Sequence, residues 1–356
     1  MQSHNLFFGK SYVFEEDAKL TSKNKTQQDL LLKILSRSNH KIEPSSIVDI
    51  LGNENLDQYK IESKNGLLYT LKISLDEDCE VLKSESEFLK NNKSVFIPNY
   101  YDSNTIKIGM PIVYLLSSYE NGFNIDDLGV AYILKNNESF FYTLNHFSNL
   151  KTERSFDEYC DLIFCSFSTK NSSDFLKSNI SNFHNFDVIN DIFKTLEQSA
   201  RSCDIDFSDT NQICHGLLTK DDIVSRNSLF KLKNFGYCFV GDPIFDLCFL
   251  SLSCGYNEHK SALLFKKYCE FVEIDFLENL NKYNSIFNCA CCIFFSKMLF
   301  EFLIEECIFS TSRPNKLLES SMKLSSTFNF LKRTSIPEQQ KKLIQKIITR
   351  PIIEKT

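Results

Sequence analysis

Two stretches of the chain decide its fold. They read Cys214-His215-Gly216-Leu217-Leu218-Thr219-Lys220-Asp221-Asp222-Ile223 and Gly241-Asp242-Pro243-Ile244-Phe245-Asp246-Leu247. Between them lies the apolar run Leu229 to Leu232, which predicts a short strand, followed by Lys233-Asn234-Phe235. Gly, Asp and Pro beside short apolar runs are typical of turns, and Asp242-Pro243 is typical of a helix start. We therefore predict short strands and turns from 212 to 250, leading into a helix.

The composition is that of a large globular chain. Its 356 residues, 42% of them hydrophobic, are enough for an extensive core and suggest two lobes or domains. The net charge of −6 argues against a broadly basic surface, so we expect no nucleic-acid partner.

The sequence also predicts a cytoplasmic protein without a membrane span. Met1 to Asn5 lacks the basic and apolar regions of a secretory signal. The strongest apolar stretch, Cys289 to Ile304, contains Lys297 and Glu301, which favours a buried helix over a membrane span. The 13 cysteines lie mostly in apolar segments without a matched pair of CxxC motifs. Reduced, buried thiols in the cytosol fit this pattern better than disulfides or zinc.

Hydrophobic periodicity predicts an α+β chain whose strands and helices segregate. Strands are expected at Ile47–Leu51, Gln58–Glu62, Leu67–Ile73, Ile106–Ile108 and Ile112–Ser117. Helices are expected at Thr26–Ser36, Glu77–Asn91, Phe140–Leu150, Phe156–Phe167, Ser173–Ile180 and Val188–Ala200, and over most of Asp246 to Leu331. We divide the chain into an N-terminal extension with a helix (1–45), a β-rich lobe (46–121), a helical lobe (122–335) and a basic tail (336–356).

These motifs, in this order, resemble the aminoglycoside phosphotransferase and choline kinase-like family. The family pattern is His-Gly-Asp-x-x-x-x-Asn, a strand, an Asp heading a short apolar-aromatic motif, and Gly-Asp-Pro-x-x-Asp-Leu. The resemblance covers about residues 47 to 305. It implies a bilobal, protein-kinase-like fold, with a β-rich nucleotide-binding-like lobe and a helical lobe that contains the catalytic loop.

The resemblance fails at the residue that carries the chemistry. A hydroxyl nucleophile needs a carboxylate that accepts its proton, and the family supplies an Asp where this chain has Leu217. His215 and Gly216 are retained, and we assign them a role in loop geometry. No other nearby carboxylate has the spacing of a replacement.

Two further positions are exchanged at the implied metal site. The family binds Mg²⁺ through the loop Asn and the later Asp, whereas this chain has Asp222 and Asn234 there. One carboxylate and one amide oxygen still suit a hard cation. Either the metal site survives with its ligands exchanged, or both positions have drifted.

The resemblance implies roles for six other residues. Lys72, in a strand-like run, would contact nucleotide phosphates and pair with Glu85, with Glu87 as the alternative. Gly52 and Asn53 lie in the turn that would cover the phosphates, and Tyr114 to Gly122 corresponds to a hinge that would bind adenine. Asp242 and Asp246 would brace the catalytic loop.

Three functions remain open at this point. The first is a pseudokinase that binds a nucleotide, a small ligand or a protein partner without ordinary phosphoryl transfer. The second is an active ATP-dependent kinase for a small molecule or peptide, with exchanged Mg²⁺ ligands. The third is a structural or assembly protein with a closed cleft. ATP and Mg²⁺ are the cofactors that the resemblance implies.

Overall fold

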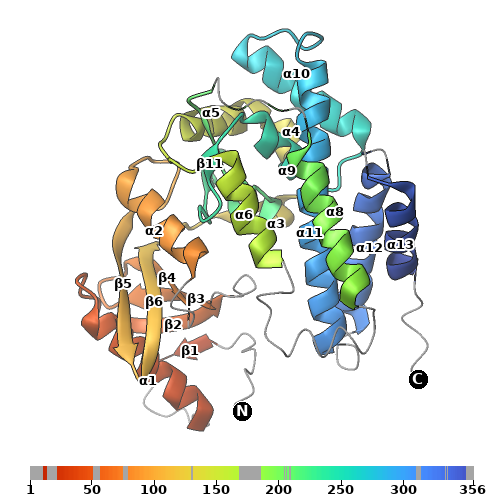
Figure 1. Cartoon of the computed structure of the whole chain (residues 1–356). Coiled ribbons are helices and arrows are strands. Elements are labelled where there is room, and N and C mark those ends of the chain that lie inside the picture. Colours follow the sequence, from red (N-terminus) through yellow and green to blue (C-terminus); the bar gives the residue numbers. More distant parts are fainter. Residues whose placement is uncertain are drawn as a thin grey trace. The chain divides into compact units, whose positions relative to one another are not determined.

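The structure is a computed structural model that divides into two compact units (Figure 1). It describes residues 11–13, 22–50, 57–74, 79–129, 131–167, 186–203, 205, 207, 210–309, 314–332, 334 and 336–349. Unit 1 comprises Met1–Phe123 and Val224–Gly236, and unit 2 comprises Asn124–Ile223 and Tyr237–Thr356. The predicted turn residues Gly52 and Asn53 and the predicted helix Ser173–Ile180 lie outside the described residues.

Unit 1 is built on a six-stranded antiparallel sheet with strand order β1-β2-β3-β4-β6-β5. The strands are β1 (Ser11–Val13), β2 (Pro44–Ile50), β3 (Asp57–Ser63), β4 (Leu68–Ser74), β5 (Tyr100–Ile108) and β6 (Met110–Ser118). Its helices are α1 (Ser22–Arg37) and α2 (Glu80–Asn91). β7 (Phe123–Asn124), β9 (Ile223–Arg226) and β10 (Leu229–Leu232) form a small second sheet.

The core of unit 1 follows from the alternation of side chains along the strands. Tyr59 and Ile61 on β3, and Tyr69, Leu71 and Ile73 on β4, are buried on one face of the sheet together with α1 residues such as Ile34. Gln58, Lys60, Thr70 and Lys72 alternate with them and therefore lie on the opposite face. The period of two thus places Lys72 away from the main apolar core.

Strand β5 is longer than the sequence predicts, because a buried carboxylate interrupts its apolar pattern. We predicted Ile106–Ile108, whereas the strand begins at Tyr100. Asp102 is 5% exposed and accepts hydrogen bonds from Tyr114 Oη (2.6 Å), Ser38 Oγ (2.7 Å) and the Asn39 backbone N–H (2.8 Å). Burial alone would raise the pKa of Asp102, but these hydrogen bonds outweigh it and lower that pKa. A carboxylate can therefore be buried within a strand when its hydrogen-bond donors come from other elements.

Unit 2 is mostly helical. Its helices are α3 (Ile125–Leu128), α4 (Ala131–Lys135), α5 (Asn137–Ser148), α6 (Phe156–Phe167), α8 (Phe186–Arg201), α9 (Ile244–Ser253), α10 (Glu258–Val272), α11 (Leu280–Phe309), α12 (Pro314–Leu331) and α13 (Glu338–Thr349). The short strands β8 (Ile213–Cys214) and β11 (Phe239–Val240) pair antiparallel, and a 3₁₀ turn, η1, spans Lys220–Asp222.

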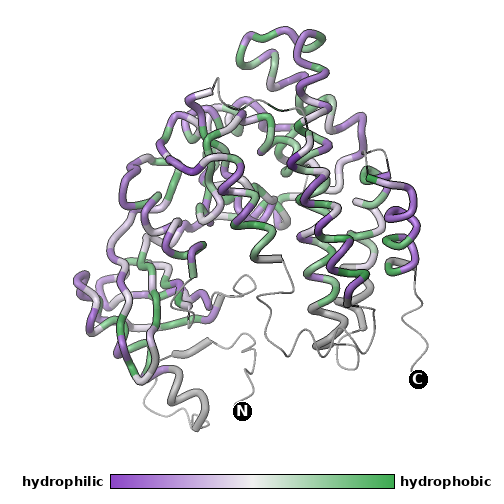
Figure 2. The backbone as a smooth tube through the Cα atoms, in the orientation of Figure 1, coloured by the Kyte–Doolittle hydropathy of each residue, from purple (hydrophilic) through white to green (hydrophobic). Residues whose placement is uncertain are grey.

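Helix α11 is the centre of unit 2, with α8 and α12 packed against it (Figure 1). It is the one described helix long and apolar enough to cross a membrane, but 72% of its apolar window is buried within the protein. Helix α8 buries Ile189, Ile192 and Leu196 at helical spacing, and its hydrophobic and hydrophilic positions alternate in Figure 2. The apolar stretch around Cys289 is therefore a core helix, as its charged residues predicted.

Candidate functional site

The Lys72 site, formed by Lys72, Glu85 and Asn234, lies in unit 1. Lys72 Nζ lies 2.6 and 2.7 Å from the two Glu85 carboxylate oxygens and 2.8 Å from Asn234 Oδ1. Lys72 is 5% exposed and Glu85 is 4% exposed. An ammonium has three N–H donors, so these three acceptors match its full capacity. The structure thus places Glu85, and not the exposed Glu87, against Lys72.

Helix α2 positions Glu85 because it buries one face. Leu82, Glu85, Phe88 and Leu89 recur at helical spacing and are all buried. Phe235, directly after Asn234, is 1% exposed and stacks on Phe88 with ring centroids 5.0 Å apart. The same helix therefore anchors both partners of Lys72.

Asn234 has a backbone conformation that few residues adopt easily. Its φ is +69°, in the left-handed region where Asn and Asp are enriched. The position thus keeps the backbone that either residue type tolerates, while the side chain is an amide and not a carboxylate. The loss of charge at this position does not require a change of backbone.

The implied Mg²⁺ fits the Lys72 site poorly. Asn234 Oδ1 already accepts a hydrogen bond from Lys72 Nζ at 2.8 Å, so a cation bound at the usual 2.1 Å would lie within about 5 Å of the ammonium. A dication and an ammonium at that separation repel by about 7 kcal/mol at an effective dielectric constant of about 20, before the attraction to the Glu85 carboxylate is counted. A carboxylate would offset this repulsion, and a neutral amide does not. Among the described residues, no group of three or more His, Cys, Asp or Glu side chains could hold a metal ion.

The predicted hinge is held by side chains that the sequence did not single out. Lys60 Nζ lies over the Tyr119 ring, 4.7 Å from its centroid. Lys231 Nζ lies 2.6 Å from Glu120 Oε2, and Ser118 Oγ donates to Glu120 Oε1 at 2.8 Å. Gln58, Lys60 and Glu62 alternate with buried residues along β3. This alternation could have predicted that Lys60 lies on the same face of the sheet as Lys72.

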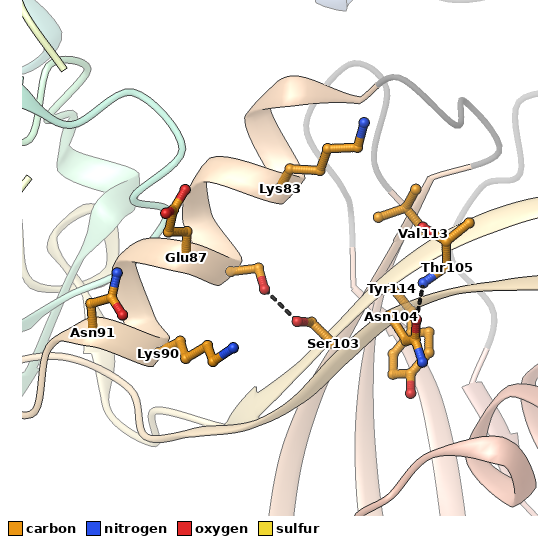
Figure 3. A pocket seen from close by; sticks show the side chains of 10 residues that line it. Lys83, Glu87, Lys90, Asn91, Ser103, Asn104, Thr105, Val113 and Tyr114 are labelled. Atoms are coloured by element: carbon orange, nitrogen blue, oxygen red, sulfur yellow. Dashed lines mark hydrogen bonds between the residues drawn. The ribbon is translucent and has the colours of Figure 1, made fainter. Parts of the chain in front are cut away.

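A separate cavity lies beside α2, away from Lys72. It has a volume of about 400 Å³ and is lined by α2 residues such as Lys83 and Lys90 and by residues of β5 and β6 (Figure 3). Ser86 Oγ on α2 donates to Ser103 Oγ on β5 at 2.5 Å. The lining does not include Lys72, Glu85 or Asn234, so the cavity is not part of the Lys72 site.

A separate candidate region is the 214–222 loop of unit 2, which Asp246 braces. Asp246 accepts hydrogen bonds from the backbone N–H groups of His215 (2.7 Å) and Gly216 (3.1 Å), and its side chain is fully buried. Burial raises the pKa of Asp246 to about 6, although His215 and these hydrogen bonds act in the opposite direction. The two bonds hold the loop backbone at the base of α9.

Gly216 is required by its surroundings. Its φ is +87°, and a Cβ there would overlap the carbonyl oxygen of Tyr237 and crowd the Tyr159 ring. Tyr159 Oη also donates to the Gly216 carbonyl oxygen at 2.8 Å. The backbone of the His215-Gly216 pair is thus fixed by Asp246 and Tyr159.

Leu217 follows this braced pair and is 8% exposed. Asp222, which stands at the position of the family's loop Asn, is 5% exposed, and its Oδ2 accepts from the backbone N–H (2.9 Å) and the hydroxyl (2.7 Å) of Thr219. The bond from the Thr219 N–H is one half of a capping box around η1, and the other half is the bond from the Asp222 backbone N–H to the Thr219 side chain. Asp222 belongs to unit 2 and Asn234 to unit 1, so the structure describes the two candidate metal ligands separately.

Asp242 starts α9. Its Oδ1 accepts from the Ile244 backbone N–H at 2.9 Å, and its Oδ2 pairs with Lys282 of α11. The helix begins at Ile244, so Asp246 lies in its first turn. Both Asp residues therefore stabilise the start of one helix, where an acidic group is favourable.

Comparisons with solved structures bear on this arrangement. The amicoumacin kinase hAmiN, solved with AMP-PNP, Ca²⁺ and Ami, matches with a TM-score of 0.55 and 14% identity, covering 91% of this chain and 100% of that chain. The chain has the protein-kinase-like fold of this kinase and of the two phosphotransferases that follow. A thermostable variant of aminoglycoside phosphotransferase APH(4)-Ia, solved with ADP and hygromycin B, matches with a TM-score of 0.53 and 10% identity, covering 85% and 97%. Choline kinase LicA from Streptococcus pneumoniae matches with a TM-score of 0.51 and 17% identity, covering 85% and 99%.

At these identities the likeness is one of fold. No model of a known protein family matches the sequence, and no curated protein matches it. The predicted α+β kinase-like fold is confirmed, since a β-sheet unit and a helical unit match the same phosphotransferases over most of the chain.

Proposed function

We propose that this protein is a pseudokinase that binds a phosphate-containing ligand, of which a nucleotide is the main candidate, without ordinary phosphoryl transfer. One observation carries the proposal. Leu217 stands immediately after the braced His215-Gly216 pair, where the resemblance calls for the proton-accepting carboxylate. An aliphatic side chain can neither accept a proton from a hydroxyl nor orient one.

The Lys72 site supports ligand binding. Lys72 is buried and charged, and it is held by acceptors on two segments of unit 1. A buried lysine of this kind is suited to contact a phosphoryl oxygen. The fold neighbours solved with ADP or AMP-PNP make a nucleotide the first ligand to test.

The free thiols of the described cysteines, most of them buried, support a reducing compartment, and we propose the cytoplasm. The physiological ligand or partner would be a small molecule or a protein. The net charge of −6 speaks against a nucleic acid.

The proposal is tested by the unfolding stability of the protein with 1 mM ADP. A ligand with a Kd of about 1–10 μM should stabilise the folded state by about 3–4 kcal/mol. The double variant Lys72→Met/Glu85→Gln removes both charges of the pair together, so it leaves no buried ion without a partner. We expect this variant to remain folded and to lose the stabilisation by ADP.

Lys64→Met is the matched control, because Lys64 is an exposed lysine of the same sheet unit, paired only with the exposed Glu43. It should respond to ADP as the wild type does. Absence of stabilisation in the wild type would contradict ligand binding and favour the structural protein with a closed cleft. Stabilisation that survives in the double variant would show that Lys72 does not hold the ligand.

A further inference from the structure

The Lys72 site has an unusual charge balance. Lys72 contributes one positive charge, Glu85 one negative charge and Asn234 none, so the site is neutral and all three Lys72 donors have acceptors. The same arrangement with a carboxylate at position 234 would carry a net negative charge. Such a site would need a cation before an anionic ligand could approach it.

We propose that the Lys72 site binds the phosphoryl group of a nucleotide without a divalent cation, and that Asn234 is the residue that makes this binding independent of metal. The inference rests on the proposed function, since it concerns the ligand of the same site. It follows from the charge balance of the site, in which the acceptor that Asn234 presents to the ammonium at 2.8 Å is a neutral amide and not a carboxylate that would attract a dication.

The geometry supplies a binding mode for such a ligand. Asn234 is the more exposed of the two residues that pair with Lys72, because it is only partly buried while Glu85 is 4% exposed. A phosphoryl oxygen can therefore replace Asn234 Oδ1 as the third acceptor of Lys72, and the Lys72–Glu85 pair stays in place. The exchange substitutes an anionic acceptor for a neutral one, which strengthens the hydrogen bond to the ammonium. A carboxylate at position 234 would instead repel the incoming phosphate.

The experiment is calorimetric titration of the wild type and of Asn234→Asp with ADP, in EDTA and in Mg²⁺. Asp has nearly the same shape as Asn and tolerates the same left-handed backbone, so the variant changes charge alone. We expect the wild-type Kd for ADP to differ by less than threefold between EDTA and Mg²⁺. Asn234→Asp should bind at least tenfold more weakly in EDTA than in Mg²⁺. Adenosine, which lacks phosphate, should bind wild type and Asn234→Asp alike.

A wild-type affinity that falls tenfold or more in EDTA would overturn the inference. Cation-independent binding by Asn234→Asp would overturn the role assigned to Asn234.

A second readout does not depend on nucleotide. Mn²⁺ alone, a probe of divalent-cation sites, is added to the wild type and to Asn234→Ala, and thermal unfolding is followed. We expect a shift in Tm below about 1 °C in both proteins, as no interaction free energy is gained. A rise in the wild-type Tm that Asn234→Ala abolishes would establish a metal site at Asn234 and overturn the inference, whether or not ADP binds.

Discussion

The Lys72 site of unit 1 and the 214–222 loop of unit 2 match different parts of the phosphotransferase pattern that the sequence resembles. The Lys72 site retains the ion pair between Lys72 and Glu85, with a neutral side chain at position 234. The loop retains its backbone brace through Asp246 and has Leu217 beside it. In each region, the residues that match the phosphotransferase pattern also satisfy buried polar groups and so stabilise the fold.

Burial explains this pattern. A buried ammonium needs its carboxylate, and two buried backbone N–H groups need an acceptor, so losing Glu85 or Asp246 costs stability. A proton-accepting side chain at position 217 is not needed to satisfy a buried donor of the folded state. An apolar residue at position 217 is therefore compatible with the fold, whose buried polar groups are satisfied by Glu85 and Asp246.

The largest expected effect comes from breaking the ion pair of the Lys72 site. Glu85→Ala leaves the Lys72 ammonium buried with one neutral acceptor, which should destabilise the protein by about 3–5 kcal/mol in urea unfolding. Glu87→Ala, two residues along the same helix and exposed, should change the unfolding free energy by less than about 0.5 kcal/mol. Equal effects of the two variants would show that Glu85 has no special partner.

The brace of the 214–222 loop gives the next largest effect. Asp246→Ala removes the acceptor of two buried N–H groups and should cost about 2–4 kcal/mol. Asp191→Ala removes an exposed carboxylate whose Lys194 partner is 3.8 Å away, so its cost should be close to zero. A small loss of stability in Asp246→Ala would mean that the loop is held by other contacts.

A smaller effect is expected at the carbonyl of Gly216. Tyr159→Phe deletes one hydrogen bond of 2.8 Å inside an aromatic cluster and should destabilise unit 2 by about 1 kcal/mol. The ring packing is preserved, so urea unfolding isolates the contribution of the hydroxyl. No change in the urea midpoint would contradict the assigned bond.

The smallest effect is a gain of stability at the end of β2. Burial, and then Asp57, raises the pKa of Asp49 to about 6. A carboxyl whose folded pKa is raised binds more protons when folded, so the contribution of Asp49 to stability falls as pH rises from about 4 to 6. Asp49→Asn should therefore be more stable than the wild type by about 1 kcal/mol at pH 7. This figure is smaller than the full effect of the pKa shift because Asp49 is partly exposed to solvent. The gain should vanish near pH 4, where the Asp49 carboxyl is protonated in the folded protein.

The sequence predicted the architecture because most elements have a regular apolar period. Helix α6 has the predicted bounds, Phe156–Phe167, and the strands around Lys72 lie within a residue or two of their predicted positions. The period of α2 also distinguishes Glu85 from Glu87, since Glu85 shares a face with Leu82 and Leu89.

Residues whose role depends on distant partners escaped prediction. Asp102 lies in the part of β5 that the apolar pattern did not predict, because the groups that satisfy it come from positions 38, 39 and 114. The Lys60–Tyr119 and Lys231–Glu120 contacts likewise join segments far apart in the sequence. The hydrogen bond from Lys72 to Asn234 spans 162 residues, so the exchange of residue types was visible in the sequence but its consequence for the lysine was not.

The most direct test of the account is the release of phosphate from γ-labelled ATP in a single turnover, with protein in excess over nucleotide. The account predicts that ATP binds and that phosphate release, in Mg²⁺ and over hours, does not exceed a blank without protein. Release above the blank in the wild type, abolished in the Lys72→Met/Glu85→Gln variant, would contradict the pseudokinase assignment and identify an active enzyme that works without a carboxylate at position 217.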